Sequence, residues 1–135
     1  MAARSKARKR AVDVLYEADL RSRDVIELLR ERVADSNPPV SEHAVRLVEG
    51  AHEHATEIDR LIGEHADGWT LDRLPDVDRA ILRMAVFELL WVPDVPDAVV
   101  IDEAVELAKA LSTDDSSSYV NGVLGGIIRR EIPTA

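Results

Sequence analysis

The chain contains no cysteine, and this absence excludes both a disulfide framework and a thiolate metal site. Aromatic residues make up only 4% of its 135 residues. No apolar run approaches the ~20 residues that a membrane-spanning helix requires. Acids interrupt residues 11–20, where a secretory signal would be continuously apolar. The composition therefore predicts one soluble cytoplasmic domain, long enough to bury a core without covalent cross-links.

Charge is distributed unevenly along the chain, which carries 17 basic and 26 acidic residues. The basic arm, residues 1–10, holds five cations and no acid: Arg4, Lys6, Arg8, Lys9 and Arg10. The remainder therefore has 17 − 5 = 12 basic against 26 acidic residues, a net charge of −14. A basic arm on an acidic body concentrates attraction for phosphates at one place and indicates nucleic acid binding. The alternative is a disordered terminus that only improves solubility.

Apolar residues recur at helical spacing along the chain, and no stretch shows a sustained period of two. The pattern predicts an all-α protein, a compact bundle of about seven helices in a single domain. The first helix continues from the basic arm, with Ser5 as its candidate N-cap. Asp24 and Glu27 have the spacing of a capping box. Ser41 is predicted to cap a longer helix whose apolar face extends to Ile62.

The second half of the chain contains the most apolar segment. Residues 77–92 are apolar around most of the helical circumference, which predicts a central buried helix. Pro75 suits an early position of that helix, and Pro93 ends it. Residues 112–118 are predicted to form a polar turn, and residues 120–128 supply the apolar face of the last helix.

The few aromatic side chains are candidates for base stacking. Tyr16 lies two turns after the basic arm, and Tyr119 lies at the start of the last helix. Either ring could stack on an unpaired base. The alternative for each is a half-buried tyrosine with its hydroxyl in water. Trp69 and Trp91 flank the central helix and are predicted to belong to the core.

One stripe of the central helix changes from charged to apolar along its length. Asp76, Arg79 and Arg83 share this stripe, and it continues into Phe87 and Leu90. Such a stripe is a candidate partner face. The alternative is a surface strip whose apolar end another helix covers.

No pattern in the chain indicates catalysis. His52 and His54 stand two residues apart, whereas a zinc-binding helix motif places its histidines one turn apart. Residues 114–118 resemble half of a calcium loop but fit a helix cap better. A glycine-rich phosphate loop and a nucleophile elbow are both missing. The sequence therefore predicts no enzyme, no metal and no cofactor.

Three segments also resemble a known family. The C-terminal signature of the NusB family of transcription antitermination factors is similar to residues 101–127, IDEAVELAKALSTDDSSSYVNGVLGGI. Residues 77–91, VDRAILRMAVFELLW, resemble that family's central helix. The basic arm followed by residues 10–16 resembles its N-terminus, and Trp69 and Leu74 stand where it often has an aromatic residue and a leucine.

The resemblance implies a fold and a function. The expected fold is all-helical, with two three-helix-like subdomains. The expected function is a non-enzymatic RNA-binding factor that recognises the boxA element of ribosomal RNA leaders. Its implied partner is the small-subunit ribosomal protein that doubles as NusE, and the complex travels with the RNA polymerase elongation complex. The family contains both monomers and homodimers.

The resemblance also assigns residues by position. The RNA-binding set is Arg4, Lys6, Arg8, Lys9, Arg10, Tyr16, Asp115, Ser116 and Tyr119. The partner-facing set is Asp78, Arg79, Arg83 and Phe87. This chain departs from the family at Ser117 and Ser118, where a histidine or lysine is common, and at Gly125 and Gly126, which replace a charged pair. The serines are expected to weaken phosphate attraction at the second RNA-binding patch.

Two other functions compete with this interpretation. The related fold also serves as the RNA-binding part of ribosomal RNA methyltransferases, which would require a downstream catalytic domain that this sequence does not contain. The chain could also be a helical protein-interaction scaffold with an incidental basic tail. RNA gel shifts over a salt series separate the scaffold from the RNA-binding factor.

Overall fold

The computed structural model describes residues 3–35, 39–66 and 73–131, and these residues form seven helices and no strand. The helices are α1 (Ala3–Leu20), α2 (Val25–Ala34), α3 (Glu42–Glu53), α4 (Ala55–His65), α5 (Asp76–Trp91), α6 (Asp97–Leu111) and α7 (Asp114–Glu131). The predicted all-α bundle of about seven helices is confirmed.

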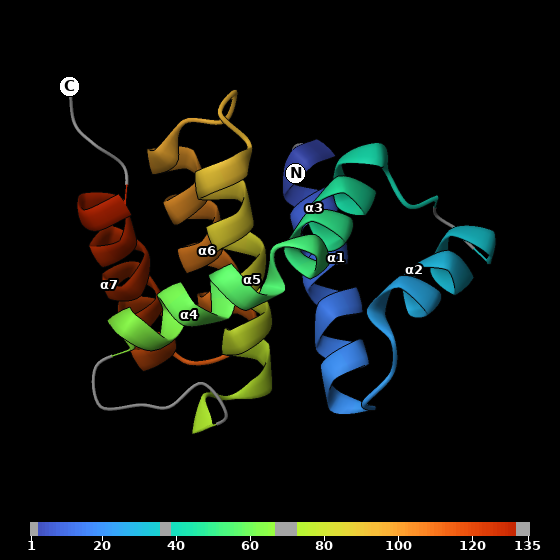
Figure 1. Cartoon of the computed structure of the whole chain (residues 1–135), viewed down its shortest axis with the longest axis horizontal. Coiled ribbons are helices and arrows are strands. Elements are labelled where there is room, and N and C mark those ends of the chain that lie inside the picture. The colour runs from blue at the N-terminus through green and yellow to red at the C-terminus, as the bar shows by residue number, and fades with distance from the viewer. Residues whose placement is uncertain (1–2, 36–38, 67–72, 132–135) are drawn as a thin grey trace.

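The helices form two groups that share α5. Figure 1 shows α1, α2 and α3 on one side of α5 and α4, α6 and α7 on the other. Helix α5 contacts five of the other six helices, and ten of its sixteen residues are buried. The central buried helix that the apolar run predicted is therefore confirmed, and its two sides correspond to the two expected subdomains.

Two of the predicted helix caps are confirmed, and one is wrong. The carboxylate of Asp24 accepts hydrogen bonds from the N–H groups of Ile26 and Glu27, and the hydroxyl of Ser41 accepts one from Ala44. Ser5 lies inside α1, which already begins at Ala3. Its hydroxyl instead donates a hydrogen bond to Glu103 on α6.

The predicted long helix after Ser41 is two helices. The chain bends at His54, whose backbone has φ −102° and ψ 18° and whose N–H bonds to the carbonyl of Gly50 at 3.0 Å. Apolar spacing continues across this bend, so the periodicity contains no signal for it. The bend directs α4 toward α7, whereas α3 packs on α1 (Figure 1).

The predicted polar turn and the tryptophans also need correction. Helix α7 begins at Asp114, so most of residues 112–118 are helical. The Thr113 hydroxyl accepts the Ser116 N–H at 3.1 Å, which satisfies a donor of the first turn. Pro75 precedes α5 as its N-cap residue. Trp91 is half-buried rather than a core residue, and Trp69 lies outside the described residues.

Candidate nucleic-acid interface

Four of the five cations of the basic arm lie near the surface at the start of α1. Arg4 and Lys6 are exposed, and Lys9 and Arg10 are half-buried. Their internal ion pairs are exposed ones: Arg4 lies 3.5 Å from Asp94, and Lys9 Nζ lies 2.8 Å from Asp13. Such pairs stabilise little and are screened by salt. These cations can therefore exchange a carboxylate for a phosphate at small cost.

Arg8 is buried, and its predicted role as an RNA contact is corrected by the structure. Its side chain is 3% exposed and forms two hydrogen bonds of 2.7 Å with Glu88 on α5 and one of 3.0 Å with Glu103 on α6. Burial is the largest single influence and lowers the pKa of Arg8, but the hydrogen bonds and negative charges of Glu88 and Glu103 together outweigh it and raise the pKa. The guanidinium therefore stays charged and ties α1 to α5 and α6.

The sequence does contain a signal for this buried pair. Arg8 stands one turn before Val12, on the side of the helix that reaches the core. Glu88 is the one acid within the buried stretch 84–89 of α5, and a buried carboxylate requires a cation. His43 Nε2 lies 3.2 Å from the same carboxylate, and burial lowers the pKa of this histidine despite Glu88.

Tyr16 lies further along α1 and is 36% exposed. It lines a hollow of about 440 Å³ between α1 and the start of α5, together with Asp13, Pro75 and Asp76. A second hollow of about 440 Å³ contains Lys6, Lys9 and Arg10 and also borders Asp13. The exposed tyrosine and the basic arm therefore face adjoining depressions of one surface.

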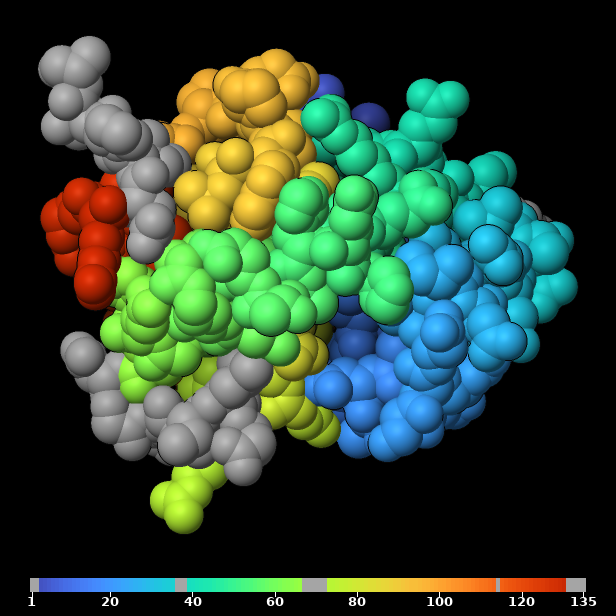
Figure 2. Space-filling model, viewed as in Figure 1, coloured from blue at the N-terminus to red at the C-terminus, as the bar shows by residue number. Residues whose placement is uncertain are grey.

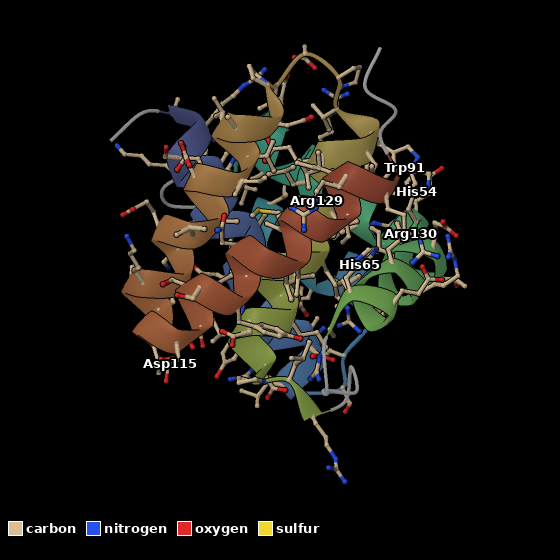
Figure 3. The ribbon with its side chains drawn as sticks, turned by 90° about the vertical axis from the view of Figure 1, so that its left-hand side faces the viewer. His54, His65, Trp91, Asp115, Arg129 and Arg130 are labelled. Atoms are coloured by element: carbon tan, nitrogen blue, oxygen red, sulfur yellow. The ribbon has the colours of Figure 1, made fainter. Side chains whose placement is uncertain are left out.

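The start of α7 carries the second predicted patch. Asp115 is exposed, Tyr119 is half-buried against the core, and Ser116 is 8% exposed. The Ser116 hydroxyl donates to the carboxylate of Asp78 on α5 at 2.8 Å. Asp115, Ser116 and Tyr119 line a hollow of about 370 Å³ that also borders Pro75. Figure 3 shows Asp115 at the beginning of α7.

These three hollows form one surface path, which we call the track. The hollow at the basic arm and the hollow at Tyr16 share Asp13, and the hollow at Tyr16 and the one at Tyr119 share Pro75. The track runs from the basic arm on α1, past Tyr16, to Tyr119 and Asp115 on α7. Seven of the nine sequence-predicted RNA-binding residues line it, and Arg4 and Arg8 do not.

The predicted partner face on α5 is not a single exposed edge. Asp78 is 2% exposed and accepts the bond from Ser116, and Phe87 is 5% exposed. Both were predicted as surface contacts, and the structure corrects this because each packs against a neighbouring helix. A Cβ at Gly50 of α3 would lie 2.0 Å from the ring of Phe87, so the ring rests directly on the α3 backbone.

The two arginines of that face pair with acids of other helices. Arg79 bonds to Asp19 of α1 at 2.9 Å and also to Asp76. Arg83 holds Asp59 of α4 in two hydrogen bonds of 2.8 and 3.0 Å, and its side chain remains 24% exposed. Arg83 lines a hollow of about 380 Å³ that is visible in Figure 2 where α1 and α2 face α4 and α5. Of the predicted set, Arg83 is the most accessible charged side chain.

The described residues contain no cluster of three metal-ligating side chains. None of the helices in the described part of the chain is long and apolar enough to span a bilayer.

Comparison with known proteins relates the chain to a family. The family model of NusB matches residues 5–129. The transcription antitermination protein NusB of Saccharopolyspora erythraea is 64% identical over 129 residues, covering 94% of this chain and 87% of the relative. The solved structure of T. maritima NusB has a TM-score of 0.86 and 35% identity, with 98% and 94% of the two chains covered. A crystal structure of the antitermination factors NusB and NusE with double-stranded RNA matches with a TM-score of 0.82 and 36% identity, covering 93% and 96%.

Proposed function

The chain belongs to the NusB family, and from this we propose that it is an antitermination factor that binds boxA-type RNA along the track. The observation that carries the proposal is the continuity of the three hollows from the basic arm to the start of α7. A single strand needs both phosphate attraction and unpaired-base contacts, and this surface offers them at different places.

The two ends of the track have different roles in this proposal. Arg4, Lys6, Lys9 and Arg10 neutralise phosphates and supply most of the affinity. Tyr16 stacks on a base beside the arm, and Tyr119 stacks on another near α7. Asp115 accepts hydrogen bonds from base edges, which adds sequence selectivity. Ser116 supports this end indirectly, because its hydroxyl is bound to Asp78.

The partner in this proposal is the small-subunit ribosomal protein that doubles as NusE. The relative solved with NusE and double-stranded RNA supports this assignment. We place the partner on the charged stripe of α5, where Arg83 is the accessible side chain, and not on the buried Asp78 and Phe87. A basic partner would extend the positive surface that this acidic body lacks.

The remaining features of the function follow from the same proposal. The protein acts by binding and not by catalysis, as a single NusB-like domain in the cytoplasm. Its RNA–partner complex joins the RNA polymerase elongation complex. A homodimer that covers the basic arm would compete with RNA, so RNA binding is expected to favour the monomer.

A titration tests this proposal. Fluorescence anisotropy would measure the affinity for a boxA-like RNA and for a scrambled RNA of the same composition, with and without the NusE partner, over a salt series. The proposal requires tighter binding to the boxA-like RNA and a further gain with the partner. Equal affinities for both RNAs in the presence of the partner would reject it.

A further inference from the structure

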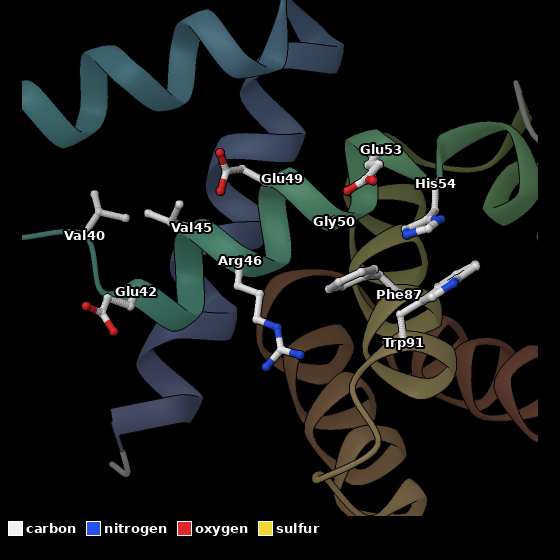
Figure 4. Close-up of a pocket in the computed structure, with 10 residues that line it drawn as sticks. All are labelled: Val40, Glu42, Val45, Arg46, Glu49, Gly50, Glu53, His54, Phe87 and Trp91. Carbon is white, nitrogen blue, oxygen red and sulfur yellow. The ribbon is translucent and has the colours of Figure 1, made fainter.

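We propose that a groove between α3 and α5 binds an arginine side chain presented by an extended segment of a partner protein. The groove measures about 520 Å³ and is drawn in Figure 4. Its floor and wall are aromatic, and its rim carries carboxylates from α3. This proposal does not depend on RNA binding, because the groove and the track share no lining residue.

Three nearly parallel rings are stacked in this groove, and we call this stack the platform. His54 stacks on Trp91 with ring centroids 4.1 Å apart and planes 13° apart. Phe87 lies 6.0 Å from Trp91 and 5.9 Å from His54, with planes inclined by 14° and 20°. Figure 4 shows the histidine and tryptophan together at one end, with Phe87 beside them. Phe87 is buried, but His54 and Trp91 are half-buried, and the uncovered outer face of such a stack can receive a planar cation.

Two features of the backbone build the platform. Gly50 lets Phe87 lie against α3, because any side chain there would occupy the position of the ring. His54 occupies the junction of α3 and α4, where its side chain makes no capping hydrogen bond. The imidazole is therefore placed by its contact with Trp91 and not by the helix end.

The rim of the groove is acidic. Glu42, Glu49 and Glu53 of α3 line it and are exposed, and none forms an ion pair within the described residues. Arg46 is the only cation among the described lining residues, so the four charges sum to −3 + 1 = −2. Figure 4 places Glu53 beside His54, next to the platform. This field repels phosphates and attracts a cation.

Arginine fits this combination better than other ligands. A guanidinium stacks on aromatic faces and also forks to carboxylates, whereas an ammonium is a compact point charge that keeps its water. The flanking Val40 and Val45 give apolar surface for the residues on either side of the arginine. Figure 3 shows Trp91 and His54 far from Asp115, at the α7 end of the track.

The test uses the full chain labelled with ¹⁵N and follows the indole N–H signal of Trp91, which a Trp91→Phe spectrum assigns. The probes are a capped peptide Gly-Leu-Arg-Leu-Gly and the same peptide with citrulline or lysine in the centre. The proposal requires a saturable shift with the arginine peptide and about tenfold weaker binding of the uncharged citrulline peptide. Equal binding of these two peptides, or no shift with the arginine peptide, would overturn it.

A matched pair of variants locates the binding. Glu49→Gln with Glu53→Gln removes two rim charges, and Glu27→Gln with Asp102→Asn removes two exposed charges outside the groove. The first pair should weaken the binding of the arginine peptide about tenfold, and the second pair should leave its binding unchanged. Equal effects of both pairs would contradict the groove. An indole shift produced by boxA-like RNA would contradict the proposal and assign the groove to RNA. A shift that grows with protein concentration alone would contradict it and assign the groove to a second copy of the chain.

Discussion

The two ends of the track differ in charge and in the way that they are held. The α1 end carries four accessible cations and is fixed from beneath by the buried pair of Arg8 and Glu88. None of the described residues that line the α7 end is a cation. The hydroxyl groups at this end form hydrogen bonds with each other and with Asp78. The α1 end is therefore suited to affinity and the α7 end to selectivity. Neighbouring cations of the basic arm have opposite roles, since Arg8 is buried and Lys9 is not.

The largest expected effect follows from removing the support of the α1 end. Arg8→Met leaves the buried carboxylate of Glu88 without its main partner, and should lower the free energy of unfolding by about 3–5 kcal/mol. Urea unfolding followed by circular dichroism measures this loss. The double variant Arg8→Met with Glu88→Leu should recover most of it, since no charge is then buried alone. A stable single variant would show that the pair does not hold α1.

The next largest effect is a loss of RNA affinity when cations at the α1 end are removed. Replacing Lys6, Lys9 and Arg10 by alanine should weaken binding to every RNA and reduce the salt slope by about two, at ~0.7 per phosphate contact. Anisotropy titrations over a salt series measure the slope. Arg30, Arg129 and Arg130 are exposed on α2 and α7 away from the track, and their alanine variant is the control. An unchanged slope in the first variant would remove the arm from the interface.

A smaller effect is expected at the α7 end. Tyr119→Leu should cost about 1–3 kcal/mol of binding to boxA-like RNA, and Tyr119→Phe should cost little, because stacking needs the ring. Scrambled RNA should lose less than boxA-like RNA. Thermal melting of both variants supplies the control. If Tyr119→Leu unfolds the protein and weakens binding to all RNAs equally, the ring stabilises the core and does not contribute to selectivity.

A cation added to the α7 end should increase its affinity for RNA. Ser118 is exposed on α7, and Ser118→Lys should raise the salt slope by ~0.7 through one new phosphate contact. Selectivity for boxA-like over scrambled RNA should fall, because the gain is independent of sequence. The same measurement on Thr56→Lys, an exposed site on α4, should show no such gain. No change in Ser118→Lys would place this part of α7 outside the path of the RNA.

The smallest effect is a dependence on pH at the α1 end. Burial lowers the pKa of His43 below its ordinary value of 6.5, so the folded protein favours the neutral imidazole. The unfolded chain then binds more protons as the pH falls through 6.5, and the free energy of unfolding decreases below that pH. In His43→Gln this part of the decrease should vanish. An unaltered pH profile in the variant would assign the decrease to other groups.

The sequence predicts the fold well where local chemistry decides. The caps at Asp24 and Ser41 and the apolar stretch of α5 each contain their own signal. The bend at His54 does not, because apolar spacing is the same on both sides of it and tertiary packing selects the direction of α4.

The sequence predicted which residue types form the candidate site, but not which of their side chains are buried. The cluster of cations at residues 4–10 indicates a phosphate-binding surface, yet only the helical phase separates Arg8 from Lys9. The stripe on α5 has a charged and an apolar half. Its arginines, however, form ion pairs with acids of α1 and α4, and the sequence of α5 alone contains no signal for these pairs. The aromatic groove depends on contacts between α3 and α5 and so has no signature in either segment.

Spin-labelled RNA tests the track most directly. A boxA-like RNA would carry a nitroxide at its 5′ end in one sample and at its 3′ end in another, and amide signals of the full chain would report proximity. One label should broaden the signals around Lys9 and Arg10, and the other should broaden those around Asp115 and Tyr119. If both labels broaden the α1 end, or neither broadens the α7 end, the RNA does not follow the track.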